Sequence, residues 1–298
     1  MHSAIEELEH DEPFSLPKFT AAVAVQMILA FAIFYWVAPV AFGSELTSGW
    51  RIMFWIVVLG LPLSLFEYLY HRYLLHSAVL PFLGRMHLAH GTHHGLTSVK
   101  APVLKSEPDH MVPVKSEYPV EEDHQHTSMS FPLYSISIFL AIFLVLLALP
   151  FKLIFPGEPI VVATMIIVAI HYSAYELWHA VMHLPFDRFW KPLMMQRRVG
   201  KVVGHVYSFH LMHHWRPTTN LAVVGFWGFA IWDHLFRTHK RPANIPLNGS
   251  LVNYSDAVLK KPLWPIALLD RWQSGLYRFS RKVESGFLRL FVRKMRQG

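Results

Sequence analysis

The sequence predicts an all-α integral-membrane protein with four transmembrane helices, and its composition points the same way. Hydrophobic residues occupy 53% of the 298 positions and charged residues only 16%, below the quarter or so that soluble domains carry. The mean hydropathy is +0.30, and four apolar stretches reach the ~20 residues that a membrane span needs. These features argue against a soluble or disordered chain. One count is unexpected in such a protein: there are 20 histidines and no cysteine.

The predicted spans form two closely spaced pairs. They cover residues 19–42 and 50–70, then 131–149 and 159–183. Short turns, 43–49 and 150–158, join the members of each pair, and Pro150 is expected to end the third span. The acidic segment before the first span lacks the basic region and cleavage site of a signal peptide.

Basic residues are concentrated after the last span. Residues 184–298 hold 19 Lys or Arg against 5 Asp or Glu. Because basic segments beside spans stay in the cytoplasm, we expect a multi-pass protein with both termini and the central loop on the cytoplasmic side. The surplus charge lies beside the membrane and no feature suggests base readout, so nucleic acid is not expected as a partner.

Three regions follow from this topology: an acidic cytoplasmic N-terminus (1–18), a membrane-embedded domain (19–240) and a basic tail (241–298). Aromatic and basic residues mix over 262–296, which is typical of one or two amphipathic helices lying on lipid headgroups. Residues 95–130 are polar and rich in proline, so they predict a flexible cytoplasmic loop with little regular structure.

Ten of the histidines fall into four boxes that end or follow the second and fourth spans. Histidine is costly in a bilayer unless it serves a site, so this grouping indicates a shared role. The boxes are HX4H (His71, His76), HXXHH (His90, His93, His94), HX3H (His179, His183) and HXXHH (His210, His213, His214).

Helix geometry places most of each box on one face. At about 100° per residue, His179 and His183 lie about 40° apart, and each HXXHH box likewise shares a face. His71 and His76 lie about 140° apart on an ideal helix. That pair needs a distorted turn, or its members bind different metal ions.

Ten imidazoles without cysteine suit a first-row metal such as iron or zinc, and four or five ligands per ion would fill two sites. The scarcity of nearby acids argues against a carboxylate-rich di-iron bundle. Three acids close to the boxes, Glu67, Glu176 and Asp233, are expected to fix the tautomers of the metal-binding imidazoles. His87 and His234 are further candidates to contact the metal centre, directly or through such partners.

At these residues the chain resembles the fatty acid hydroxylase and sterol desaturase superfamily of integral-membrane di-iron enzymes. The matching motifs are EYxxHRxxxH (67–76), HGxHH (90–94), HxxxH (179–183), HxxHH (210–214) and WDxxFxT (232–238). The spacing is most similar to the fatty acid 2-hydroxylase branch, although the interval from His183 to His210 looks longer. The resemblance implies four transmembrane helices under a cytoplasmic helical cap that encloses two iron ions, for which zinc can substitute in preparations.

The implied activity is O2-dependent hydroxylation of an unactivated C–H bond in a lipid from the bilayer: a fatty acyl chain, a sphingolipid, a sterol or a similar molecule. No side chain acting as an acid or base breaks such a bond, so metal and O2 are required. The haem-binding His-Pro-Gly-Gly of a fused cytochrome b5 domain is absent. Electrons are therefore expected from a separate NAD(P)H-linked donor of the ferredoxin, rubredoxin or cytochrome b5 type.

Two alternatives remain at this point. The same di-iron centre could serve a lipid desaturase, or an enzyme that processes aldehydes or ether lipids. A histidine-rich metal transporter is the more remote alternative, since it requires polar residues along a path near the bilayer midplane. The spans offer little beyond Gln26, Ser64, Thr164 and His171 for such a path.

Overall fold

The computed structural model describes residues 15–81, 83–101, 111–122, 125 and 129–295. The chain divides into two compact units, each built from separate stretches of sequence. The first unit comprises residues 1–66, 129–181 and 223–229, and the second comprises residues 67–128, 182–222 and 230–298. Helix dominates both units, and the strands are short.

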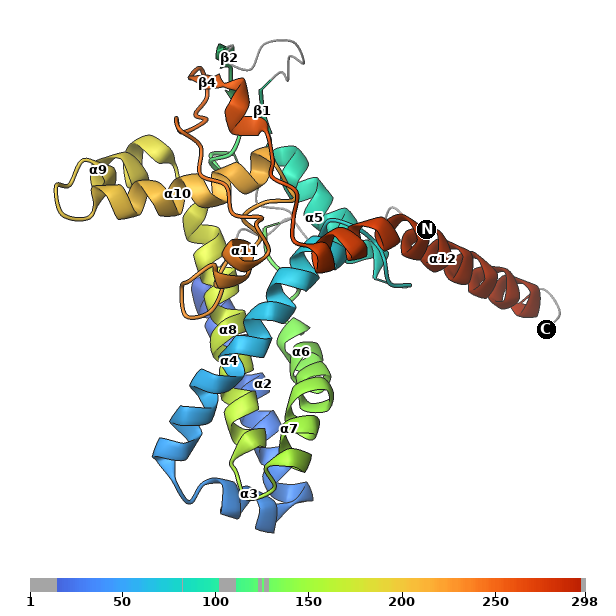
Figure 1. Cartoon of the computed structure of the whole chain (residues 1–298). Helices are drawn as coiled ribbons and strands as arrows, with labels where there is room; N and C mark the ends of the chain where they lie inside the picture. Colours follow the sequence, from blue (N-terminus) through green and yellow to red (C-terminus); the bar gives the residue numbers. More distant parts are fainter. Residues whose placement is uncertain (1–14, 82, 102–110, 123–124, 126–128, 296–298) are drawn as a thin grey trace. The chain divides into compact units, whose positions relative to one another are not determined.

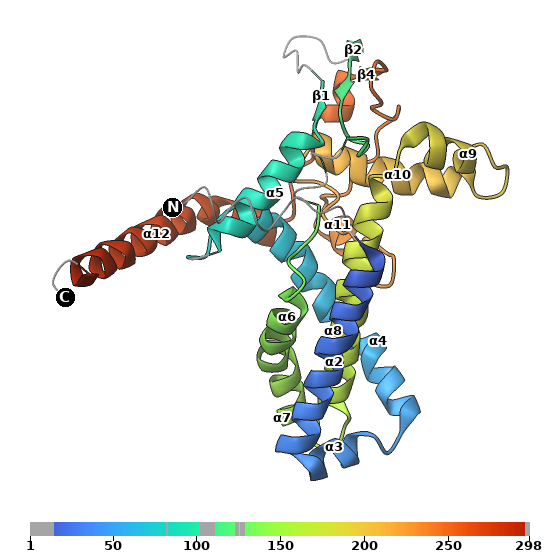
Figure 2. The same cartoon turned by 180° about the vertical axis from the view of Figure 1, so that it is seen from behind.

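The first unit is a bundle of apolar helices (Figures 1 and 2). Four helical stretches are long and apolar enough to cross a membrane: Leu16–Val37, Gly49–Leu75, Ser135–Ile154 and Ile160–Met182. The prediction of four candidate spans is therefore confirmed. The elements are α2 (Leu16–Val37), α3 (Pro39–Glu45), α4 (Gly49–Tyr70), α6 (Ser135–Phe143), the π-helix η3 (Leu144–Ala148), α7 (Leu149–Ile154) and α8 (Ile160–Met182).

The ends of two spans differ from the prediction, and a proline explains each difference. The first span ends at Val37 because the chain leaves helical geometry at Ala38, just before Pro39, as residues preceding proline tend to do. Pro150, by contrast, does not end the third span. The helix continues through it to Ile154, since Pro150 lies in the first turn of α7 directly after the π-helix, where proline is tolerated.

The bundle has an apolar interior and an apolar exterior. Leu59, Ile136, Ile160 and Ala163 are fully buried in its core. Large apolar side chains are also exposed on the outside, including Ile28, Leu146 and Leu153 at 64–74% of their surface. An exterior of this kind is unfavourable in water and suits lipid.

Ion pairs hold the turns that join the spans. The buried carboxylate of Glu45 pairs with Lys152 at 2.7 Å and accepts a hydrogen bond from the Val162 amide at the start of α8. Arg51 makes two hydrogen bonds to the carboxylate of Glu158, at 3.0 and 2.6 Å. These contacts satisfy charges and a helix-terminal N–H that would otherwise lack partners.

The second unit contains most of the histidine boxes. Its helices include the π-helix η1 (His71–Leu75), α5 (Gly84–Leu96), η4 (Phe186–Trp190), α9 (Lys191–Met194), α10 (Gly200–Trp215), α11 (Ile231–Leu235), the 3-10 helix η5 (Tyr254–Ala257) and α12 (Trp264–Met295). The predicted amphipathic tail is thus a single helix over residues 264–295, drawn in red in Figure 1.

The proline-rich segment has more structure than the sequence analysis predicted. β1 (Val99–Lys100) pairs antiparallel with β3 (Lys115–Ser116), and β2 (Met111–Pro113) pairs antiparallel with β4 (Leu251–Asn253). Burial alternates along this stretch, so that residues 112, 114, 116, 118 and 120 are inside. This period of two is typical of strands, and the prolines between the buried positions obscured it. The expectation of little regular structure was therefore wrong for residues 111–120.

The close approach of the Trp227 side chain explains Gly60 in the middle of α4. A Cβ placed on Gly60 would lie 3.0 Å from the indole Nε1 of Trp227. Trp227 belongs to the irregular segment 223–229 of the same unit and has a φ of 52°, which L residues other than glycine rarely adopt. Glycine on α4 therefore leaves room for this aromatic ring.

Candidate metal centre

The ten histidines of the four boxes come together in two groups of five. In each group the ligand nitrogens all lie within 4.8 Å of one another. The first group is His71, His76, His90, His94 and His213; the second is His93, His179, His183, His210 and His214. Either group could hold a metal ion. No Asp, Glu or other residue of the described chain belongs to these two groups.

A π-helix explains how His71 and His76 face the same group. Residues 71–75 form η1, and the His76 amide donates to the carbonyl of His71, five residues earlier, at 3.2 Å. This wider turn replaces the α-helical i→i−4 pattern. The two imidazole rings are stacked, with centroids 5.2 Å apart and an interplanar angle of 18°. The distorted turn that the 140° separation required is therefore present.

The nitrogens of the first group are spaced as the ligands of one ion are. The Nε2 atom of His90 lies 3.2 Å from that of His71 and 3.1 Å from those of His76 and His94. His76 and His213 bring their Nε2 atoms to 3.1 Å. Two ligands about 2.1 Å from a metal, at angles of about 90–109°, are themselves about 3.0–3.4 Å apart. The donor set and its spacing thus fit a first-row metal ion.

The second group is formed by imidazoles that are all buried. His183 has its ring centroid 4.8 Å from that of His93, 5.1 Å from that of His210 and 4.7 Å from that of His214. His179 lies in the last turn of α8, His183 directly follows that helix, and His179 is the fifth member. The HX3H spacing on an α-helix therefore brings both of its histidines to one group, as the HX4H spacing does on the π-helix.

Each HXXHH box is divided between the two groups. On α5, His90 and His94 belong to the first group and His93 to the second; on α10, His213 belongs to the first group and His210 and His214 to the second. Positions i and i+4 of a helix share a face more closely than adjacent residues do. The rings of His94 and His214 meet between the groups, stacked at 4.1 Å. Both groups consequently depend on the packing of α5 and α10.

Backbone carbonyls fix the tautomer of several ligands. A carbonyl can only accept, so the Nδ1 atom opposite it must carry the proton and leave the Nε2 lone pair for a metal. The Nδ1 of His71 donates to Leu221 at 2.6 Å and that of His213 to Thr219 at 2.8 Å. The corresponding acceptors in the second group are Tyr118 for His183 (2.9 Å), Thr97 for His214 (2.9 Å) and Met129 for His179 (3.3 Å).

Asp233 acts through the backbone loop that carries two of these acceptors. Its buried carboxylate accepts hydrogen bonds from the amides of Leu221 and Ala222, at 3.0 and 2.9 Å, and from the hydroxyl of Thr238 at 2.7 Å. Burial raises the pKa of Asp233, and the three hydrogen bonds oppose this shift. Asp233 therefore supports the imidazole of His71 through the main chain, because its carboxylate holds the loop whose Leu221 carbonyl accepts from His71.

Glu176 likewise supports His179 through the backbone. Both of its carboxylate oxygens lie 3.3 Å from the amide of Phe131, two residues after Met129, whose carbonyl accepts from His179. Glu176 therefore binds the segment whose carbonyl orients His179. Glu67 is buried, 5% exposed, and belongs to the second unit with His71 and Asp233.

The other two predicted contacts of the metal centre lie outside both groups. The Nδ1 of His87 donates to the carbonyl of Leu75 at 2.8 Å, so His87 holds the last residue of the π-helix. His234 is exposed and stacks on His239 with ring centroids 4.0 Å apart.

Burial keeps the ligands neutral, as metal binding requires. The pKa of His183 is lowered to about 4, mainly by burial. Burial also lowers the pKa of His76, His90 and His214 well below the ordinary value, and neighbouring imidazoles add to the effect. The charged form is disfavoured in each case because there is neither water nor an anion to stabilise it.

Sequence reasoning missed the residues that support the second group from the proline-rich segment. Tyr118 is fully buried; its carbonyl accepts from His183 and its ring lies 4.4 Å from the His183 imidazole. The hydroxyl of Thr97 donates to the carbonyl of His93 at 2.6 Å. The available signal in the sequence was the alternation of apolar residues around Tyr118, at positions 112, 114, 118 and 120.

No family model, no curated protein and no solved structure matches this chain. The superfamily resemblance therefore stays a prediction that rests on the motifs quoted above.

Deletion of Leu74 tests the role of the π-helix. Removing one residue from a π segment restores an α-helix, in which the two histidines become i and i+4 and still share a face. We expect the deletion variant to retain its bound metal. Deletion of Leu69 instead rotates both histidines by about 100° relative to the preceding helix, and should release about one ion per chain. Equal metal contents, measured by plasma mass spectrometry, would contradict this interpretation of η1.

The lowered imidazole pKa values predict how the metal-free protein responds to acid. An unfolded histidine has a pKa near 6.5, whereas that of folded His183 is about 4. The unfolded chain therefore binds more protons as the pH falls from about 6.5 towards 4, and the free energy of unfolding decreases over that window by about 1.4 kcal/mol per pH unit for each such group. Above pH 7 this contribution is constant.

The measurement is thermal unfolding of chelator-treated protein in detergent between pH 8 and pH 4.5. Replacing His183→Gln should reduce the slope below pH 6.5, while Ser285→Ala, at an exposed and uncharged position, should leave it unchanged. An acid slope that is the same in all three proteins would count against burial of neutral imidazoles as its origin.

Proposed function

We propose that this chain is an O2-dependent di-iron monooxygenase that hydroxylates an unactivated C–H bond of a lipid. One observation carries the proposal: ten imidazoles converge in two groups of five, with no carboxylate in either, in a chain that has four candidate membrane spans. The proposed membership of the fatty acid hydroxylase and sterol desaturase superfamily rests on the same ten residues.

The size and chemistry of the two groups support a reactive centre over a structural one. A structural zinc site is closed by four ligands, and two such sites would need only eight. Five imidazoles leave one position of a six-coordinate ion for a small molecule. An all-imidazole set suits iron and also accepts zinc.

Two bound iron ions would supply the redox chemistry that activates O2 for attack on a C–H bond. The overall reaction consumes a substrate C–H bond, O2, two electrons and two protons, and yields the alcohol and water. The chain has no cysteine for an iron–sulfur cluster. We therefore assign electron delivery to a separate NAD(P)H-linked donor of the ferredoxin, rubredoxin or cytochrome b5 type.

The chain's own residues position the ligands and protect the site. Carbonyls of Leu221, Thr219, Tyr118 and Thr97 hold the imidazoles in one tautomer. Burial of the imidazoles limits access of water, which would otherwise compete for an open coordination position. These contacts are set before any substrate arrives, so ligand geometry need not reorganise during the reaction.

The lipid substrate and the cytoplasmic side are part of the proposal. His71 and His179 lie within the last residues of candidate spans, and His76 and His183 directly follow them. A ligand set at the end of a span can be reached by an acyl chain from the bilayer. The basic residues of 184–298 support a cytoplasmic location for this end by the positive-inside rule, where a soluble electron donor has access.

A desaturase, or an enzyme acting on aldehydes or ether lipids, would use the same ligands. The outcome depends on where the substrate carbon lies relative to the oxidant, to within about an ångström. We favour hydroxylation because the spacing of the histidine boxes is most similar to that of the fatty acid 2-hydroxylase branch. Analysis of the lipids distinguishes the products of these reactions.

Metal analysis tests the centre itself. Purified protein should contain about two metal ions per chain. His214→Ala removes a buried ligand of the second group and should lower this value by about one ion. His234→Ala alters an exposed imidazole outside both groups, so its metal content should match the wild type. A wild-type value near zero after purification without chelator would end the di-metal proposal.

Comparative lipid mass spectrometry tests the reaction. Cells that express the wild-type chain should contain a lipid heavier by one oxygen than the corresponding lipid of cells that express His213→Ala. Loss of two hydrogens would instead assign desaturation. Identical lipid profiles, with both proteins present in the membrane and the wild type loaded with iron, would argue against oxidation of that host's lipids.

A further inference from the structure

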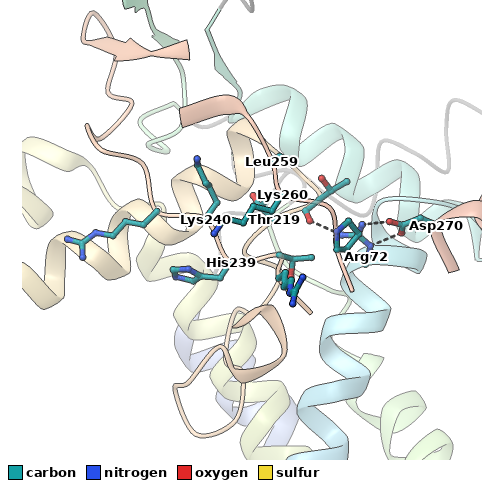
Figure 3. Close-up of a pocket in the computed structure, with 12 residues that line it drawn as sticks. Arg72, Thr219, His239, Lys240, Leu259, Lys260 and Asp270 are labelled. Atoms are coloured by element: carbon teal, nitrogen blue, oxygen red, sulfur yellow. Dashed lines mark hydrogen bonds and ion pairs between the residues drawn. The ribbon is translucent and has the colours of Figure 1, made fainter. Parts of the chain in front are cut away.

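A cavity of about 510 Å³ lies in the second unit, beside the loops that hold the first histidine group. We call it the basic pocket (Figure 3). It is lined by residues 218–219 after α10, residues 237–241 after α11, residues 259, 260 and 262 before α12, and by Arg72 and Asp270. Its titratable basic residues are Arg72, Arg237, His239, Lys240, Arg241 and Lys260.

The positive charges of the pocket greatly outnumber its negative ones. Asp270 is the single carboxylate in the lining, and it is engaged by Arg72 through two hydrogen bonds of 2.9 and 2.7 Å, drawn as dashed lines in Figure 3. Arg237, Lys240, Arg241 and Lys260 make no ion pair with a carboxylate of the described residues. Four cationic side chains therefore line the pocket without an acid to balance them.

His239 adds a neutral hydrogen-bonding group to these charges. Burial lowers its pKa to about 4, and His234, His205 and Arg241 contribute to the shift. The imidazole is therefore uncharged at neutral pH. Its Nε2 atom is buried and makes no hydrogen bond to any described residue. A buried polar atom usually has a partner, so a bound ligand would supply what the protein does not.

Arg237 is held in an unusual backbone conformation at the pocket. Its φ is 62°, in the left-handed region that residues other than glycine seldom occupy. The next residue, Thr238, is fixed by its hydrogen bond to Asp233. Such strain persists where the surrounding structure imposes it, and it is frequent at binding sites.

The available space exceeds that of a single small ion. A second cavity of about 360 Å³ is lined by His234, Arg237, His239 and Lys260, three of which also line the basic pocket. The two cavities therefore adjoin around shared side chains. An anionic group that carries a substituent fits this space better than an isolated chloride would.

We propose that the basic pocket binds a phosphate group, carried by a lipid headgroup or by a soluble phosphate ester. The planar guanidinium groups of arginine match phosphate oxygens in pairs, and lysine adds point charges. The neutral imidazole of His239 offers one further hydrogen bond. An acidic protein segment is less suited, because the basic residues line a cavity of about 510 Å³ that accommodates a compact anionic group.

The pocket shares its walls with the supports of the first histidine group. Thr219 lines the pocket, and its carbonyl accepts from His213. Thr238 also lines the pocket, and its hydroxyl binds the carboxylate that holds the 221–222 loop. A ligand here would contact the segments that orient metal-binding imidazoles. Phosphate binding itself does not require the proposed oxidation, so either proposal can fail alone.

The test uses the purified full chain in detergent and two probes. Inorganic pyrophosphate, titrated calorimetrically, represents soluble phosphate. Phosphatidic acid and diacylglycerol with the same acyl chains, compared for retention by native mass spectrometry, isolate the contribution of a lipid phosphate. We expect saturable binding of pyrophosphate, selective retention of phosphatidic acid, or both. Pyrophosphate alone would indicate a soluble ligand, and phosphatidic acid alone a headgroup.

Matched variants distinguish the pocket from general positive charge. Lys260→Gln removes one lining charge and should weaken binding at least fivefold. Lys261→Gln removes the neighbouring exposed charge outside the pocket and should change binding less than twofold. Arg237→Asn keeps a residue that tolerates a positive φ and should weaken binding about tenfold without lowering the melting temperature. Absence of binding to both probes, or equal weakening by the two lysine variants, would overturn the proposal.

Discussion

The convergence of ten imidazole side chains, nine of them in the second unit, is the constraint on which the candidate metal centre depends. Nitrogen lone pairs repel one another when they are brought to 3.1–3.2 Å without a proton or cation between them. Such a buried arrangement is stable only if hydrogen bonds from Nδ1 fix the rings and a cation binds the Nε2 lone pairs. The backbone around the histidines meets the first requirement, and a metal ion would meet the second.

The hydrogen bonds that orient the rings are accepted largely by main-chain carbonyls. Two carboxylates act indirectly, because they bind the backbone segments that contain some of these carbonyls. Asp233 holds the amides of 221 and 222, and the Leu221 carbonyl holds His71. Glu176 holds the amide of 131, and the nearby Met129 carbonyl holds His179. This arrangement keeps negative charge away from the metal ligands, so each site remains a set of neutral donors. It also makes loops as important to the centre as the helices that carry the histidines.

Sequence reasoning identified the candidate ligands because histidine is costly in an apolar chain and its helical spacing is easily recognised. All ten box histidines belong to the two groups, and the four candidate spans were predicted within a few residues at most boundaries. The π-helix was anticipated only as an unspecified distortion, since HX4H does not reveal which hydrogen bonds change. Tyr118 was missed because Pro113 and Pro119 interrupt the alternation around it, and Thr97, which directly follows α5, carries no such pattern. His87 and His234 lie outside the two groups, and His87 holds the Leu75 carbonyl at the end of η1.

The sequence by itself determined the class of protein and the identity of the donor atoms, because hydrophobicity, charge and histidine spacing are local properties. Only the tertiary structure decided how the donors are divided. His93 and His213 each leave their box neighbours for the other group, since α5 and α10 present adjacent residues to different sides of a shared interface. Which carbonyl orients which ring, and which cations line a pocket without an acid, also depend on contacts between residues distant in sequence, such as His71 and Leu221, 150 positions apart. Such contacts arise from packing, and no local pattern in the chain encodes them.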